Sequence, residues 1–185
     1  MADGLFGLAA DEQGYPFNQV PTHAYWSQRG GVAGWGSICG AITPAAVFIS
    51  YVTDEETQME LVNELMAWYQ QAPFPIYQPD GEVLQTVADS TLCHVSVTKW
   101  HHASGHDKQS QEKKWRCGGL SADVAKFTVQ MLNDYADGKF ESKYKPAAIV
   151  GECQSCHSPL TQGKDNCVMC HTDPQPADLH EPFMP

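Results

Sequence analysis

The sequence predicts a mainly α fold, in which a helical domain over residues 1–145 precedes an irregular C-terminal segment over residues 146–185. Apolar residues recur at helical spacing between residues 55 and 71 and again between 121 and 137, which is typical of amphipathic helices. Hydrophobic residues make up 42% of the chain, enough to bury a core between such helices. The C-terminal segment instead holds four of the seven cysteines and six prolines, so we expect covalent chemistry to hold it together.

The first half of the helical domain shows clear stop signals. Residues 1–36 are rich in Gly, Pro and aromatic residues and are expected to be mostly irregular, followed by a helix over 37–52. Asp54 should cap a second helix, since Asp accepts hydrogen bonds from free backbone N–H groups. That helix should end before Pro73.

The second half of the domain carries two further expected helices. The third runs over residues 90–103 and a polar loop follows it. Ser121 is expected to cap the fourth, which ends at Gly138 because glycine readily adopts the left-handed conformation of a helix end.

Charge and hydropathy exclude two classes of function. The 22 acidic and 11 basic residues give a formal charge of −11, and no basic stripe exists to neutralise nucleic-acid phosphates. No apolar run approaches the roughly 18 residues of a membrane-spanning helix. We expect redox protein partners with basic or mixed surfaces.

Two C-x-x-C-H motifs carry the clearest chemistry: Cys153, Cys156 and His157, then Cys167, Cys170 and His171. Two thiols at this spacing form thioethers with one haem, and the adjacent histidine becomes the proximal iron ligand. The alternative is a zinc ribbon, since ten residues separate the two cysteine pairs, but a ribbon does not require a histidine after each. The motifs therefore predict two covalently bound haem c groups per chain.

The short connection between the motifs predicts closely placed haems. Nine residues separate His157 from Cys167, and they span at most roughly 35 Å. With bis-histidine ligation such haems are suited to electron transfer, and no catalytic residues stand out. The predicted function is a dihaem electron carrier rather than a catalyst, and the alternative is an oxidoreductase whose haems work with a non-haem iron–sulfur site.

Other histidines and cysteines supply further candidate ligands. His94 and His101 lie seven residues apart on the expected third helix, on one face. The remaining histidines outside the motifs are His23, His102, His106 and His180. Three cysteines lie outside the motifs and form a possible iron–sulfur site, although such a cluster normally takes four ligands: Cys39, Cys93 and Cys117.

Three runs of the helical domain resemble the split-Soret cytochromes c: residues 30–41, 92–100 and 116–125. The resemblance implies a homodimer with stacked bis-histidine haems, whose distal histidines come from the other subunit. Covalent haem attachment normally takes place outside the cytoplasmic membrane, so we expect a periplasmic or extracellular location. The resemblance makes His94 the first candidate for a distal haem ligand. The second distal ligand is either His23 or His101, and His102 is the next candidate after these two. Relatives in this family carry further cysteines that this chain lacks, so the resemblance leaves open whether a cluster binds here. The N-terminus shows no leader, and we expect that one has been removed.

Overall fold

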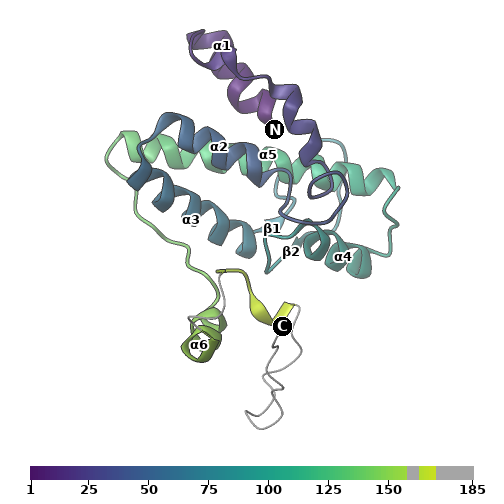
Figure 1. Cartoon of the computed structure of the whole chain (residues 1–185). Helices are drawn as coiled ribbons and strands as arrows, with labels where there is room; N and C mark the ends of the chain where they lie inside the picture. Colours follow the sequence, from purple (N-terminus) through teal and green to yellow (C-terminus); the bar gives the residue numbers. More distant parts are fainter. Residues whose placement is uncertain (158–162, 170–185) are drawn as a thin grey trace. The chain divides into compact units, whose positions relative to one another are not determined.

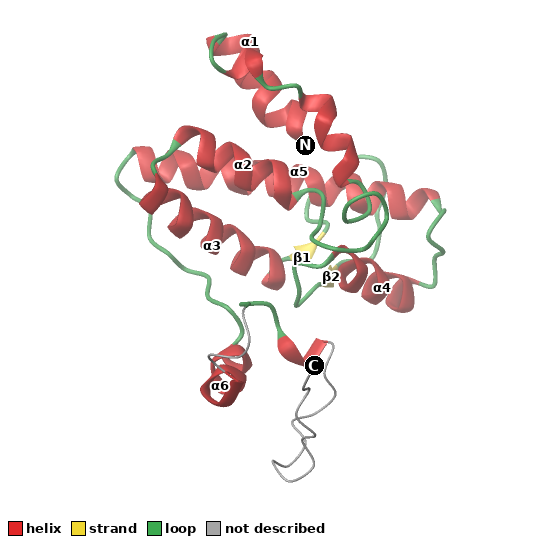
Figure 2. Ribbon diagram, viewed as in Figure 1, coloured by secondary structure: helices red, strands yellow, loops and turns green. Residues whose placement is uncertain are grey.

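A computed structural model of the chain describes residues 1–157 and 163–169, and the chain divides into two compact units, residues 1–145 and 146–185. The described part of the first unit is built mainly from helices (Figures 1 and 2). The predicted mainly α fold class is confirmed. None of the described helices is long and apolar enough to span a membrane.

Three helices form the centre of the first unit, and each contacts the other two: α2 (Ile42–Val52), α3 (Glu55–Gln71) and α5 (Gln111–Ala136). Figure 1 shows them side by side. Their core includes fully buried Ile42, Leu65 and Val124. The ring of Trp68 also stacks on that of Phe127, with centroids 4.0 Å apart. Burial of these apolar side chains is the main force that holds the three helices together.

Short elements complete the first unit. A two-stranded antiparallel sheet joins β1 (Pro73–Phe74) to β2 (Thr86–Val87), and α4 (Cys93–Ser104) contacts β2. The N-terminal 36 residues hold four short helical elements: η1 (Asp3–Gly7), α1 (Leu8–Gln13), η2 (Phe17–Gln19) and η3 (Thr22–Gln28). Phe6 anchors this region, since it is fully buried and its ring packs against Phe48 of α2. This region therefore holds more helix than the sequence predicted.

The predicted start is correct for α3 and wrong for α5. Asp54 caps α3 as expected, because its side chain accepts a hydrogen bond from the Thr57 N–H at 2.9 Å. The fourth helix does not begin at Ser121. Ser110 caps α5 eleven residues earlier, and Ser121 bonds the Cys117 carbonyl inside the helix. Gly118 and Gly119 lie inside this helix, and two adjacent glycines are typical of a break between helices. The sequence therefore did not predict the first turns of α5.

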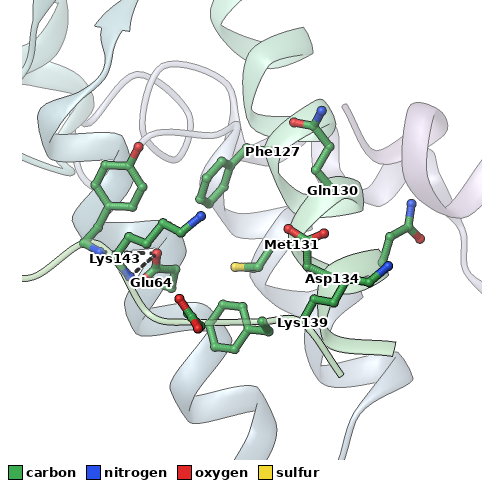
Figure 3. Close-up of a pocket in the computed structure, with 11 residues that line it drawn as sticks. Glu64, Phe127, Gln130, Met131, Asp134, Lys139 and Lys143 are labelled. Carbon is green, nitrogen blue, oxygen red and sulfur yellow. Dashed lines mark hydrogen bonds between the residues drawn. The ribbon is translucent and has the colours of Figure 1, made fainter. Parts of the chain in front are cut away.

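A carboxylate holds the end of the first unit in place. Glu64 of α3 is 3% exposed and accepts hydrogen bonds from the Ser142 hydroxyl at 2.8 Å and from the backbone N–H groups of Lys143 and Tyr144. Glu64 lies at the edge of a cavity of about 450 Å³ between α3, α5 and the segment over residues 139–144, and Figure 3 shows its carboxylate hydrogen-bonded there. The carboxylate thus fixes the residues that lead out of the helical domain.

The second unit contains α6 (Ala148–His157) and η4 (Cys167–Met169) among its described residues. Helix α6 covers the first C-x-x-C-H motif, where the sequence showed little helical periodicity. Ala147 and Ala148 favour helix and lie at its start, and Val150 is buried.

Two adjacent glycines of α5 provide a matched test of the packing. A Cβ at Gly119 would lie 2.2 Å from the Tyr77 carbonyl oxygen, whereas a Cβ at Gly118 would meet nothing within 4 Å. We expect Gly119→Ala to lower the free energy of unfolding by about 1–3 kcal/mol, because backbone must move. Gly118→Ala should raise it by about 0.5–1 kcal/mol through helix propensity. Urea unfolding measures both, and equal effects would contradict the close approach.

The Glu64 anchor predicts a local opening. Glu64→Ala leaves two part-buried backbone N–H groups without this acceptor, so we expect the free energy of local opening at Lys143 and Tyr144 to fall by about 1–2 kcal/mol. Amide hydrogen exchange at these residues measures it. Exposed Glu60 on the same helix is the control, and Glu60→Ala should leave the exchange rates unchanged. Unchanged protection in Glu64→Ala would show that the anchor lies elsewhere.

Candidate redox site

Three cysteines from three separate elements form the candidate site, which we call the three-cysteine site: Cys39, Cys93 and Cys117. Cys39 lies just before α2, Cys93 is the first residue of α4, and Cys117 lies on α5. All three are free and partly buried. The sequence separates them by 78 residues from first to last, so only the fold brings them together.

A short backbone crossing places Cys39 beside Cys93. Ile38 and Leu92 form an isolated antiparallel bridge. The Cys39 N–H donates to the Thr91 carbonyl at 2.9 Å, and the Cys93 N–H donates to the Ser37 carbonyl at 2.7 Å. Both cysteines are therefore held by their own backbone atoms, independently of any side-chain contact.

The glycine-rich loop before Cys39 makes this crossing possible. Gly36 has a φ of +75°, which favours glycine, and a Cβ there would lie 2.9 Å from the Cβ of His94. Its carbonyl accepts a hydrogen bond from the His94 N–H at 3.0 Å. The loop can approach the start of α4 only because this residue has no side chain.

A buried polar network lies among the cysteines. One guanidinium nitrogen of Arg116 donates to Ser96 Oγ at 2.7 Å, and the Tyr69 hydroxyl lies 3.4 Å from the same oxygen. Tyr69 also hydrogen-bonds Cys39. All three polar residues are at most 1% exposed. The network therefore connects α3, α4 and α5 next to the thiols.

Burial keeps two of the thiols protonated. Desolvation raises the pKa of Cys39, while Tyr69 and Arg116 act in the opposite direction. Desolvation, together with the neighbouring Cys39 and Cys117, raises the pKa of Cys93 to about 11. A bound metal ion would have to displace these protons, because thiolate is the form that ligates metals.

The donor atoms of the three cysteines suit iron, but the cysteines lie too far apart in the described structure to bind one metal ion together. Three thiolates suit iron and other soft-binding metals, and Arg116 Nε is buried with no hydrogen-bond partner among the described residues. No group of three His, Cys, Asp or Glu residues in the described part of the chain is arranged closely enough to hold a metal ion. The three cysteines are close enough that ionisation of one disfavours ionisation of the others. Their sulfur atoms would have to move closer together to bind one metal ion.

The described part of the C-terminal segment brings two cysteines of the C-x-x-C-H motifs together. Cys153, Cys156 and His157 lie on α6, and Cys167 opens η4. Desolvation and the adjacent Cys167 thiol raise the pKa of Cys153, so one cysteine of each motif contacts the other. Cys170, His171 and His180 lie outside the described residues.

The candidate distal histidines are spread over the first unit. His94 and His101 both lie on α4, where His94 is exposed and His101 partly buried, and His23 lies exposed in η3. His101 Nδ1 lies 2.6 Å from the His106 carbonyl, and the His106 ring stacks on Trp100. This contact fixes the His101 ring and leaves its buried Nε2 without a partner among the described residues. His102 is exposed on the same helix, and the roles of all these histidines stay predictions.

Sequence reasoning found the cysteines but missed the polar network around them. Arg116 drew attention in the sequence only as the first residue of a run. Its position directly before Cys117 was the available signal, because a cation beside a thiol is a common means of adjusting its charge.

Comparisons with known proteins identify related chains. A family model described as "Putative redox-active protein (C_GCAxxG_C_C)" matches residues 2–131. The split-Soret cytochrome c of Desulfovibrio desulfuricans is 34% identical over 185 positions, covering 91% of this chain and 66% of the relative. A solved structure described as a novel iron centre in that cytochrome matches with a TM-score of 0.87 and 31% identity, covering 92% of this chain and 78% of the other. The chain thus spans just under two thirds of the length of the curated relative.

These comparisons correct the predicted function. The sequence predicts a dihaem electron carrier defined by closely stacked bis-histidine haems, and the alternative is an oxidoreductase whose haems work with a non-haem iron–sulfur site. The matched proteins are described as a cytochrome with a novel iron centre and as a redox-active protein, and none of these descriptions names a pair of haems. The function predicted from the C-x-x-C-H motifs is therefore wrong as stated.

The family description also marks where this chain departs from its relatives. The Gly-Cys-Ala-x-x-Gly run in the family's name does not occur in the sequence, since no cysteine here follows a glycine. The match nevertheless covers more than half of the chain and includes all three residues of the three-cysteine site. The chain therefore belongs to the C_GCAxxG_C_C family of redox-active proteins and, within it, to the split-Soret cytochromes c.

Proposed function

We propose that this chain is a redox-active protein in which iron at the three-cysteine site is reduced and reoxidised by one electron at a time. The observation that carries the proposal is that the thiols of Cys39, Cys93 and Cys117 interact with one another beside a buried polar network. The iron centre named for the matched structure supports it. Iron bound to these thiolates would supply the redox couple.

The protein's own residues prepare the site in three ways. The bonds between residues 37–39 and 91–93 fix two cysteine backbones. Metal binding therefore costs little further loss of backbone conformational entropy. The Tyr69 hydroxyl hydrogen-bonds Cys39 and thereby stabilises its ionised form. The partly buried environment limits the access of water to the sulfur atoms.

We propose covalent haem as the second cofactor, with one haem c at each C-x-x-C-H motif. Thioether attachment would use Cys153 and Cys156 for the first haem and Cys167 and Cys170 for the second, with His157 and His171 as proximal ligands. Membership of a cytochrome family supports haem over a zinc ribbon at these motifs.

We also propose that the protein is a periplasmic or extracellular homodimer. Covalent haem attachment, which normally takes place outside the cytoplasmic membrane, supports the location. Large exposed aromatic residues in the N-terminal region support an interface, among them Tyr15 at 78%, Trp26 at 62% and Trp35 at 87% exposure.

Loss of a cysteine tests the iron site. In Cys117→Ser we expect non-haem iron to fall by at least about tenfold, because a serine hydroxyl is a much poorer ligand for iron. Haem staining after denaturing electrophoresis should be unchanged. The reciprocal variant, Cys153→Ser with Cys156→Ser, should lose one haem and keep the non-haem iron. Full iron content in Cys117→Ser would contradict the proposed site.

Thiol reactivity tests the environment of Cys93 in the protein freed of non-haem iron. With a pKa of about 11 this thiol should hold about a hundredfold less thiolate at pH 8 than a thiol of ordinary pKa near 9. Alkylation by iodoacetamide, followed by peptide mass spectrometry, should therefore be slow and accelerate about tenfold per pH unit up to pH 11. The urea-unfolded chain is the control and should level off near pH 9. The same plateau in the folded chain would contradict the burial.

A further inference from the structure

We propose that the buried guanidinium of Arg116 is the positive counter-charge of the iron centre, where it strengthens iron retention and raises the midpoint potential. This inference rests on the proposed function. It assigns a role to a residue that does not itself ligate the metal.

Arg116 is the one Lys or Arg side chain that is buried in the described part of the chain, at 1% exposure. No carboxylate of the described residues forms an ion pair with it. Its guanidinium donates hydrogen bonds to neutral oxygens of Ser96, the carbonyl at 3.3 Å and Oγ at 2.7 Å. A buried charge without a partner of opposite sign is strongly unfavourable, so a group that brings negative charge should bind beside it.

A second feature of Arg116 also indicates that a partner group is missing beside its side chain. Arg116 Nε is buried and has no hydrogen-bond partner in the described residues. A buried donor without an acceptor is rare in folded proteins, and it often marks a site that a ligand or ion completes. Here the donor belongs to a charged group, which increases the cost of leaving it unpaired.

The position of Arg116 selects the three-cysteine site as the source of the negative charge. Arg116 directly precedes Cys117 on α5, and its bonding partner Ser96 follows Cys93 by three residues on α4, close to one face. The guanidinium also acts on the charge of both Cys39 and Cys93. The cation thus interacts with Cys39 and Cys93 and belongs to the residue that precedes Cys117 in the sequence.

Charge balance gives the direction of the effect. Three thiols release three protons when they bind Fe³⁺, and the resulting centre is neutral. One electron, supplied in the experiment by dithionite, converts it to Fe²⁺ with three thiolates, which carries one negative charge. A nearby cation stabilises this reduced form more than the oxidised form, and therefore raises the midpoint potential.

The test compares full-length holoprotein carrying Arg116→Met, Arg116→Lys or Lys126→Met with wild type. Lys126 is exposed on the same helix, so Lys126→Met removes an equal charge at a solvated position. Melting temperatures are measured after the non-haem iron is removed by chelation and again after ferrous iron is restored. A dithionite titration followed by electron paramagnetic resonance gives the midpoint potential of the non-haem iron.

We expect Arg116→Met without non-haem iron to melt at or above the wild-type temperature, because it removes an uncompensated buried charge. On addition of iron, its rise in melting temperature should be less than half that of wild type, and its midpoint potential should be lower. Arg116→Lys should restore the potential, and Lys126→Met should match wild type.

Two results would overturn the inference while leaving the proposed function intact. The first is an iron-free Arg116→Met protein that melts below wild type or fails to fold, which would show a purely structural role. The second is an unchanged potential and an unchanged response to iron. Failure of the proposed function is distinguishable, because wild type itself would then show no iron-dependent rise, or Cys117→Ser would retain its iron.

Discussion

The backbone crossing between residues 37–39 and 91–93 is the constraint on which the candidate site depends. Two hydrogen bonds and one isolated bridge join chain segments more than fifty residues apart, and each hydrogen bond uses the N–H of a cysteine. Helix α4 begins at the crossing, so its direction and the placement of Ser96 follow from it. The glycine-rich loop supplies the close approach that the crossing needs, since Gly36 lies against His94 where a side chain has no space.

Much of the fold follows from local signals, and the errors have physical reasons. The Asp54 cap and the end of α3 before Pro73 were predicted because each depends on adjacent residues. The start of α5 was missed because two glycines in mid-helix resemble a break, although Gly119 is there to admit the Tyr77 carbonyl. Helix α6 was missed because a helix of ten residues with one buried side chain shows little periodicity.

The site could be predicted only as a set of residues. The cysteines are visible in the sequence, but their proximity depends on packing among α2, α3, α4 and α5 that no local pattern encodes. The polar network of Tyr69, Ser96 and Arg116 depends on the same packing. The functional prediction went wrong for a related reason: two conspicuous haem motifs outweighed three scattered cysteines, whereas the relatives are described by an iron centre and redox activity.

The charge distribution connects these observations. The chain carries a formal charge of −11, which leaves its surface with a strong excess of acidic groups, yet the cation that it buries lies beside thiols that are neutral in the absence of metal. Folding without iron must therefore tolerate an unpaired guanidinium, and the large apolar core of the three central helices offsets that cost. Binding of ferrous iron would convert the three thiols to thiolates and leave one net negative charge beside the guanidinium. Stability and redox function would then be coupled at one residue, because the charge that is unfavourable in the iron-free protein is the charge that favours the reduced centre.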